Sequence, residues 1–355
     1  MARVHPLPGR RPNQPFLRLP VARTKTSLKT KAHLRIASQN MRGRSHAGQD
    51  LSKWREVEVH MRDQKVGILA VQETHLCDDL IRKVNLDRKE LKLFCSPDPE
   101  SPTNRGGVGV VLNKRLVQTQ GARMWVLVPG KAIVVSFNWH REQKLSVLAV
   151  YAPNDPSENK EFWTTIRDAL RQNADIPRPH VLKGDFNMVE SMQDRFPASL
   201  NNADMSAEFQ ELLTYLELVD GWRETNPRKF SSTWQNPSAE IHARLDRIYV
   251  SEGVFAASRN WRAPGLRWCS GTDHLPVYVD LVNPEMPFVG KGHWSMGLHH
   301  LRIKKLLTEI VNAGKMMIRE IDDLESRQRD PQNNTQLRKN PRSTRGCKAN
   351  SVSAC

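Results

Sequence analysis

Short β-branched runs alternate with segments of helical periodicity between Leu34 and about Val282, and this alternation most constrains the fold. Runs of strand length, bounded by Gly, Pro, Asn or Asp, predict strands at 34–38, 66–72, 107–112, 132–138, 145–151, 180–184, 244–250 and 277–282. Apolar residues at helical spacing predict helices at 50–64, 159–173 and 205–218. The mixture predicts an α/β (α+β) domain over 34–283, with two sheets that carry helices on their outer faces.

The pattern changes beyond Pro284. Residues 284–297 are glycine-containing and predict a linker, and apolar residues then recur at steps of four and three from Ile303 to Leu324. This spacing predicts an amphipathic helix over 298–325. Its apolar seam either packs on the chain's own domain or binds a partner helix, and the sequence leaves both interpretations open.

The positive charge is concentrated near the two ends of the sequence. The chain of 355 residues has 54 Lys and Arg against 38 Asp and Glu, a formal net charge of +16. Nine basic and no acidic residues fall in the first 35 positions, and seven basic residues with only Asp330 fall in 326–355. We expect basic, disordered arms at 1–33 and 326–355, which either neutralise phosphates on a nucleic acid or are simply solvated.

The sequence contains no segment typical of a membrane span or of a secretory signal. No apolar run approaches the ~18 residues of a membrane span, and the Arg-rich beginning lacks the apolar core of a secretory signal. The five cysteines are scattered, without a C-x-x-C pair. We therefore expect an intracellular protein with reduced thiols, nuclear in location, monomeric and without a membrane partner.

Polar groups follow six of the strand-like runs. Loops at strand ends build sites in layered sheet proteins, so six such groups in order predict one site, although each alone is a weak signal. They are Gln39-Asn40, Gln72-Glu73-Thr74-His75, Tyr151-Ala152-Pro153-Asn154, Gly184-Asp185-Phe186-Asn187, Arg244-Leu245-Asp246-Arg247 and Gly271-Thr272-Asp273-His274.

These residue types suit phosphodiester hydrolysis, which needs charge neutralisation at phosphorus, an activated water and help for the leaving oxygen. The Glu73 carboxylate and the Asn40 carbonyl suit a hard cation such as Mg²⁺. Asp185 and Asn187 are two apart, so on a strand end they should face the same side, where one accepts a proton and the other donates a hydrogen bond.

His274 needs an orienting carboxylate to fix its tautomer and to support a positive charge near a phosphate oxygen. Asp246, at the end of a different predicted strand, is the candidate.

The ordered set of polar groups resembles the endonuclease/exonuclease/phosphatase superfamily, the metal-dependent fold of DNase I and the apurinic endonucleases, over about residues 34–282. Arg105-Gly106-Gly107, the run Gly-Asp-Phe-Asn-Met-Val from Gly184 and the run Asp-Arg-Ile-Tyr-Val-Ser from Asp246 resemble the endonuclease domain of LINE-type retrotransposon proteins, especially fungal ones.

The resemblance implies a four-layer α/β/β/α sandwich of two mixed sheets and a DNA endonuclease of retroelement origin. It implies Mg²⁺, with Mn²⁺ as an alternative, and products with a 3′-hydroxyl and a 5′-phosphate. Glu73 is then the main metal ligand, with Asn40 and Asp273 nearby; Asp185 activates or orients water and Asp246 holds His274. The implied contacts to the scissile phosphate are Tyr151, Asn154, Asn187 and His274.

Two positions depart from the family pattern. Apurinic endonucleases carry an acid where this chain has Arg42, which disfavours a dedicated repair enzyme, and Thr272 replaces the common Ser. Two alternatives stay open: a phosphatase or phosphodiesterase of the same superfamily, disfavoured by Met188 and by the run 241–243, and a catalytically silent nucleic-acid-binding remnant. Trp234 and five other tryptophans could stack on bases, although we expect at least half of them to be core residues.

Deletion of residues 1–35 should weaken DNA binding and flatten its salt dependence, because fewer counterions are released when basic residues are lost. Turnover of bound DNA should change little. Fluorescence anisotropy across a salt series measures this, and an unchanged slope would refute the role of the arm.

Overall fold

The computed structural model describes residues 33–46, 50–140, 143–199, 204, 206–236, 238, 240–282 and 304–329. The chain divides into two compact units, 1–290 and 291–355. The predicted linker at 284–297, residues 330–355 of the tail predicted at 326–355 and residues 1–32 of the predicted arm lie outside the described residues. Residues 326–329 of that predicted tail are instead helical, because the C-terminal helix ends at Arg329.

The first sheet has six strands in the order β14-β15-β1-β2-β4-β3. β1 runs parallel to β2 and antiparallel to β15, so the sheet is mixed. The bounds are β1 His33–Asn40, β2 Val66–Gln72, β3 Leu91–Ser96, β4 Val108–Asn113, β14 Ser258–Arg262 and β15 Val277–Val282.

The second sheet also has six strands, in the order β10-β13-β8-β7-β6-β5. β7 and β8 are parallel, whereas β8 and β13 are antiparallel and place Asp246 directly opposite Asp185. A small third sheet has the order β11-β12-β9. The bounds are β5 Gln118–Val128, β6 Ala132–His140, β7 Gln143–Tyr151, β8 Val181–Asp185, β9 Arg195–Phe196, β10 Leu218–Asp220, β11 Trp234–Gln235, β12 His242–Ala243 and β13 Asp246–Ser251.

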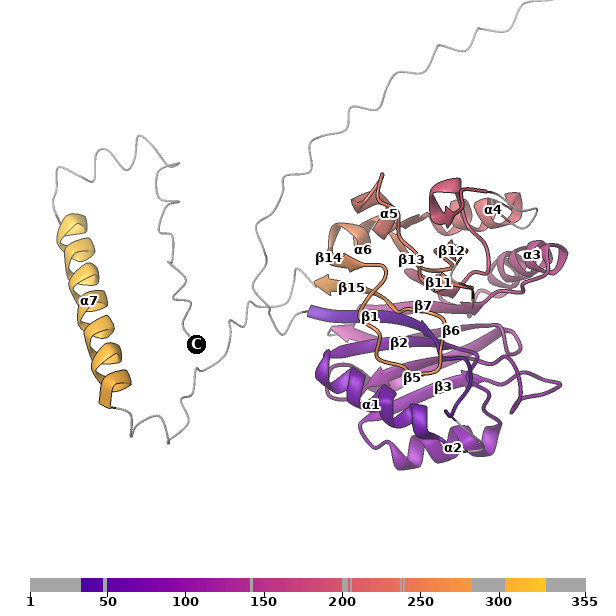
Figure 1. The fold of residues 1–355 in the computed structure, drawn as a ribbon, viewed down its shortest axis with the longest axis horizontal. Coiled ribbons are helices and arrows are strands. Elements are labelled where there is room, and N and C mark those ends of the chain that lie inside the picture. Colours follow the sequence, from indigo (N-terminus) through magenta and orange to yellow (C-terminus); the bar gives the residue numbers. More distant parts are fainter. Residues whose placement is uncertain are drawn as a thin grey trace, which may run out of the picture. The chain divides into compact units, whose positions relative to one another are not determined.

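Helices cover the outer faces of the two large sheets. α1 and α2 pack on the first sheet, and α3 and α4 lie on the side of the second (Figure 1). The helix bounds are α1 Ser52–Asp63, α2 Asp78–Asp87, α3 Pro156–Gln172, α4 Ala207–Leu216, α5 Gly221–Thr225, α6 Glu252–Ala256 and, in the second unit, α7 Lys304–Arg329, with a short 3₁₀ turn at Met192–Asp194.

The predicted α/β fold class and four-layer order are confirmed, and each of the eight predicted strands has a counterpart. The short strands of the third sheet, the edge strands β3, β5, β10 and β14 and the helices α2, α5 and α6 were not predicted. β5 is only partly buried along its length, so it lacks the continuous apolar run on which the strand predictions relied.

Three apolar layers hold the sandwich together. The central layer, between the two sheets, includes Ile36, Val135 and Val279, whereas Trp54 and Trp163 anchor the outer layers beneath α1 and α3. All residues of β2 are buried because both faces of its sheet are covered, which explains why its sequence is almost continuously apolar.

The deletion of residues 1–35 proposed above would remove the first three residues of β1. β1 begins at His33, and Arg35 within it donates to Asp280 of β15 at 2.7 Å. Removal of residues 1–35 would therefore shorten a central strand and break an ion pair. A deletion that ends at residue 32 tests the charge of the arm without that damage.

Lys183 is a fully buried lysine in the central layer. Its Nζ donates across the gap between the sheets to the carbonyl of Ala37 on β1 at 3.0 Å and to that of Ile68 on β2 at 3.2 Å. Burial lowers the pKa of its ammonium well below the ordinary value, because desolvation disfavours the charged form. Lys183 thus ties the second sheet to the backbone of the first, two residues before Asp185.

Substitution of Lys183→Met should change how stability depends on pH. Because the pKa of Lys183 is lower in the folded chain, the unfolded chain binds more protons as the pH falls below the ordinary lysine pKa, and this destabilises the wild type. The stability of the wild type relative to the variant should therefore rise as the pH increases toward the ordinary lysine pKa of about 10.4. Urea unfolding of both proteins measures this difference, and parallel pH curves would contradict a lowered pKa of Lys183.

Candidate active site

A cleft of about 840 Å³ opens where strands of the two large sheets end. Residues that follow β2, β7 and β8 reach it from separate parts of the sequence. Of the predicted site residues, those that line it are Glu73, Tyr151, Asn154, Asp185, Asn187, Asp273 and His274. Asn40 and Asp246 are completely buried and bond to cleft residues.

Asn40 links the two sheets at the bottom of the cleft. Its Nδ2 donates to Glu73 Oε1 at 2.8 Å and to Asp185 Oδ2 at 3.0 Å. Its Oδ1 accepts the backbone N–H of Arg42 at 3.0 Å. Asn40 therefore holds two carboxylates side by side, in addition to any part its carbonyl oxygen takes in metal binding.

His274 lies between two buried carboxylates. Its Nδ1 is 2.8 Å from Asp246 Oδ2, and its Nε2 is 3.7 Å from Asp185 Oδ2. Burial by itself lowers the pKa of an imidazole, but Asp246 and Asp185 outweigh it and raise the pKa of His274 to about 10. The ring is therefore an imidazolium at neutral pH.

For Asp185, burial has a larger effect on the pKa than the neighbouring positive charge has. Burial raises the pKa of its carboxyl to about 6, the nearby Asp246 adds to the rise and His274 opposes it. Its Oδ1 accepts the backbone N–H of Asn187 at 3.1 Å. A carboxylate with a pKa close to neutrality is suited to accept a proton from water at physiological pH.

Asn187 lines the cleft because of a turn after β8, not because it continues the alternation of the strand. β8 ends at Asp185, and Asn187 has a left-handed φ of 50°. Its Nδ2 donates to the carbonyl of Ala152 at 2.7 Å, which fixes the side chain in place. The expectation that Asp185 and Asn187 share a side by alternation was wrong in its reason, although both line the cleft; Phe186 is buried in the core, as expected.

Tyr151 and Asn154 lie on the β7 side of the cleft. Tyr151 is the last residue of β7 and pairs in register with Asp185. Burial raises the pKa of its phenol, and the neighbouring Glu73 and Asp185 add to the rise, so the hydroxyl keeps its proton as a donor. Asn154 follows three residues later, just before Asp155 caps α3.

Asp273 is held by two residues that the sequence did not connect with it. The indole Nε1 of Trp234 donates to Asp273 Oδ2 at 3.2 Å, and Arg42 Nη1 lies 3.5 Å from the same oxygen. Trp234 also forms an isolated β-bridge with His274. Trp234 is thus partly buried at the site instead of in the core. Because 39 residues separate it from Asp273, no local pattern could have indicated the contact.

The carboxylate oxygens of the cleft suit a hard cation. Glu73 and Asp273 present carboxylates to the cleft, which are oxygen ligands of the kind that Mg²⁺ prefers. Asn40 directs its Nδ2 at Glu73 and its Oδ1 at the Arg42 N–H, so it orients the Glu73 carboxylate. The groups present therefore fit this ion.

A different trio among the described residues, Asp185, Asp246 and His274, has ligand atoms within 4.8 Å of one another. We interpret it as a hydrogen-bonded ion cluster, because the imidazolium already supplies the positive charge between the two carboxylates.

Not every residue in the predicted polar groups reaches the cleft. Arg244 and Arg247 are buried, and Arg244 donates to Asp194 at 2.7 and 3.0 Å. Asp194 also pairs with Arg223, so this network anchors the segment that leads to β9. The segments around β9, β11 and β12 supply a rim that the sequence did not predict, with Arg195, Pro197, Ser199, Glu240 and Ile241.

The fold and site agree with a known family. A family model described as Endonuclease/Exonuclease/phosphatase family matches residues 37–274. The chain belongs to this family. The superfamily comprises metal-dependent phosphodiesterases, and the acidic and imidazole groups of the cleft are consistent with such a site.

Similar proteins include a transposon protein and two endonucleases of known structure. "Transposon TX1 uncharacterized 149 kDa protein" of Xenopus laevis is 24% identical over 247 residues, which are 68% of this chain and 18% of that protein. The chain thus spans less than a fifth of that relative. AP endonuclease LMAP from Leishmania major has a TM-score of 0.58 at 16% identity, covering 71% of this chain and 88% of its own. The endonuclease domain of TRAS1, a telomere-specific non-LTR retrotransposon, has a TM-score of 0.51 at 14% identity, covering 70% and 98%. These structures share the fold.

Substitution of Asp246→Asn should lower the pKa of His274 from about 10 by more than one unit, because burial then opposes the charged ring with one fewer carboxylate to offset it. NMR titration of the imidazole in metal-free protein measures this change. Asp63→Asn, an exposed site on α1, is the control and should leave the titration unchanged. Equal pKa values in wild type and Asp246→Asn would show that Asp246 does not set the charge of the ring.

Proposed function

We propose that the chain is a Mg²⁺-dependent DNA endonuclease of retroelement origin that cleaves phosphodiesters to a 3′-hydroxyl and a 5′-phosphate. The observation that carries the proposal is the joint presence in one cleft of a carboxylate with pKa about 6 and an imidazolium about 3.7 Å away. A proton acceptor and a cationic donor side by side are what hydrolysis of a phosphodiester requires.

Asp185 is the proposed general base. Its two oxygens are oriented by Asn40 and by the Asn187 backbone, so the carboxylate is held in place before substrate arrives. It would accept a proton from the attacking water as the oxygen of that water bonds to phosphorus. General base catalysis of this kind contributes roughly 10²–10⁴-fold to a rate.

His274 is the proposed cationic contact to the scissile phosphate. Its Nδ1 side is occupied by Asp246, so the Nε2 proton is the one that faces Asp185 and the cleft. Tyr151, Asn154 and Asn187 would donate further hydrogen bonds to the nonbridging oxygens. Preorganised donors stabilise the charge that develops in the transition state.

Glu73 and Asp273 are the residues that would hold Mg²⁺, with Asn40 beside them. Bound there, the ion would neutralise charge on the phosphate and stabilise the leaving oxygen. The contacts of Arg42 and Trp234 with Asp273 restrict the orientation of this carboxylate before the ion arrives.

DNA as substrate and retroelement origin rest on the similarity to the TX1 transposon protein and to the TRAS1 endonuclease domain. A nucleic-acid substrate is typical of the family. The excess of basic residues near the ends of the chain is favourable for a polyanionic substrate. No helix in the part of the chain that the structure describes has the length and apolarity to cross a membrane.

The purified chain should nick supercoiled plasmid with Mg²⁺, and Glu73→Gln or His274→Gln should each slow nicking by at least about 100-fold, since each removes charge stabilisation at the phosphate. Gel electrophoresis of the plasmid measures the rate. The nicks should prime a DNA polymerase without phosphatase treatment, which tests for the 3′-hydroxyl.

Glu90→Gln is the matched control, because Glu90 is half-buried on the surface, pairs with Arg115 and does not line the cleft. It should nick at the wild-type rate. Nicking at equal rates by the wild type and both cleft variants would point to a contaminant. A wild type that binds DNA yet stays inert with Mg²⁺ and Mn²⁺ would support the silent remnant, and hydrolysis of inositol phosphates instead of DNA would support the phosphatase.

A further inference from the structure

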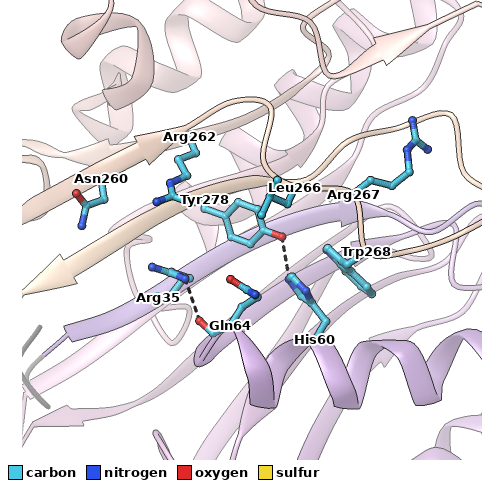
Figure 2. Close-up of a pocket in the computed structure, with 9 residues that line it drawn as sticks. All are labelled: Arg35, His60, Gln64, Asn260, Arg262, Leu266, Arg267, Trp268 and Tyr278. Carbon is cyan, nitrogen blue, oxygen red and sulfur yellow. Dashed lines mark hydrogen bonds between the residues drawn. The ribbon is translucent and has the colours of Figure 1, made fainter. Parts of the chain in front are cut away.

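A second pocket, of about 170 Å³, lies on the outer face of the first sheet beside α1 (Figure 2). Tyr278 of β15 is central to it and belongs to the outer apolar layer, whereas its neighbours Val277 and Val279 point into the central layer. The pocket shares no lining residue with the cleft. It is therefore a separate feature of the fold.

An irregularity in β14 places an arginine at this pocket. The pairing of β14 with β15 shifts register between Arg259 and Arg262, and Asn260 within the irregularity has a left-handed φ of 55°. The shift sets Arg262 opposite Tyr278. Bulges of this kind re-aim side chains, and Figure 2 shows Arg262 and Arg35 on the same side of the Tyr278 ring.

A glycine allows the following loop to lie directly on Tyr278. A Cβ built on Gly265 would meet Tyr278 Cε2 at 2.0 Å, so any side chain there would displace the ring. The Gly265 N–H donates to the carbonyl of Pro276 at 2.6 Å, which fixes the loop. The loop brings Trp268 to the other side of the pocket, where its ring stacks on His60 at 4.3 Å.

The pocket is positively charged. Three arginines and no Asp or Glu line it, and Arg262 has no ion pair with any residue in the described part of the chain. Asp280, beside the pocket, pairs with Arg35 and accepts from Asn260, so it offsets the charge of Arg35 but not those of Arg262 and Arg267. Arg35 donates through Nε and Nη2 to Asp280 and through Nη1 to the Gln64 carbonyl, which leaves two of its five N–H donors. Burial and the nearby Arg35 lower the pKa of His60 to about 4, so the imidazole adds no charge at neutral pH.

Arg267 adds charge at the mouth of the pocket. Its side chain extends outward from Tyr278 in Figure 2 and donates to the Thr272 carbonyl at 2.5 Å. We infer that its contribution to a ligand is electrostatic, whereas Arg262 and Arg35 supply the direct donors.

We propose that this pocket binds a phosphate group, either free or within a nucleic acid backbone, between Arg262, the remaining donors of Arg35 and the Trp268 wall. Guanidinium groups bind phosphate oxygens through paired N–H donors. The volume of 170 Å³ is below the ~300–1,000 Å³ of pockets for larger organic ligands, which favours a small anion or a single backbone phosphate.

The test uses the full chain labelled with 5-fluorotryptophan and kept metal-free with EDTA, so that it is independent of catalysis. The ¹⁹F resonance of Trp268, assigned with Trp268→Phe, is followed during titration with inorganic phosphate and with a short DNA duplex. Wild type should show a saturable shift that Arg262→Gln loses. Arg82→Gln, a loss of the same charge from the exposed face of α2, should keep the shift.

The titration with the DNA duplex identifies the source of the phosphate. If a backbone phosphate occupies the pocket, Arg262→Gln should reduce the slope of log affinity against log salt by about 0.9, the value for one lost phosphate contact. An unchanged slope with a retained response to inorganic phosphate would assign the site to free phosphate. No saturable shift with either probe, an equal shift with chloride at matched ionic strength, or a shift that survives Arg262→Gln would overturn the proposal. Plasmid nicking by Arg262→Gln should persist at saturating DNA, which separates this result from the proposed function.

Discussion

The carboxamide of Asn40 joins the two halves of the cleft, and the rest of the site depends on this contact. Glu73 follows a strand of the first sheet, and Asp185 ends a strand of the second. Two neighbouring carboxylates repel each other, but Asn40 Nδ2 donates to both of them. The backbone N–H of Arg42 donates to Asn40 Oδ1 and so fixes the orientation of the amide. Such a bridge can form only if β1 and β8 face each other in one register, which Lys183 supports by donating to β1 and β2.

Several residues of the cleft have a backbone conformation or a buried charge that does not favour the stability of the fold. Arg42, Glu73 and Asn187 are non-glycine residues with φ near +50°, and all three line the cleft. Strained backbone of this kind costs free energy and clusters at functional sites. A buried imidazolium between two carboxylates likewise gives little net stability, because desolvation offsets attraction. Together these features indicate that the cleft is arranged for chemistry.

One loop connects the cleft with the second pocket. Arg267 at the pocket donates to the Thr272 carbonyl, while the Thr272 hydroxyl donates to the Asn40 carbonyl and accepts the N–H of His274. The segment that carries Asp273 and His274 is therefore held at one end by the outer face of the first sheet. A phosphate at the pocket would contact the same loop that carries His274, so the two sites share a structural element although they share no lining residue.

The sequence by itself determined the central strands, the fold class and the polar residues at the strand ends, because continuous β-branched runs and strand-end motifs are local signals. It did not show that Trp234 and Arg42 hold Asp273, or that Arg262 faces Tyr278. These contacts join residues far apart in the chain, and they depend on a register shift and on short strands with no periodicity of their own. The tertiary structure alone decided them, because burial and hydrogen-bond geometry at each position are set by the facing sheet and by the loops packed against it.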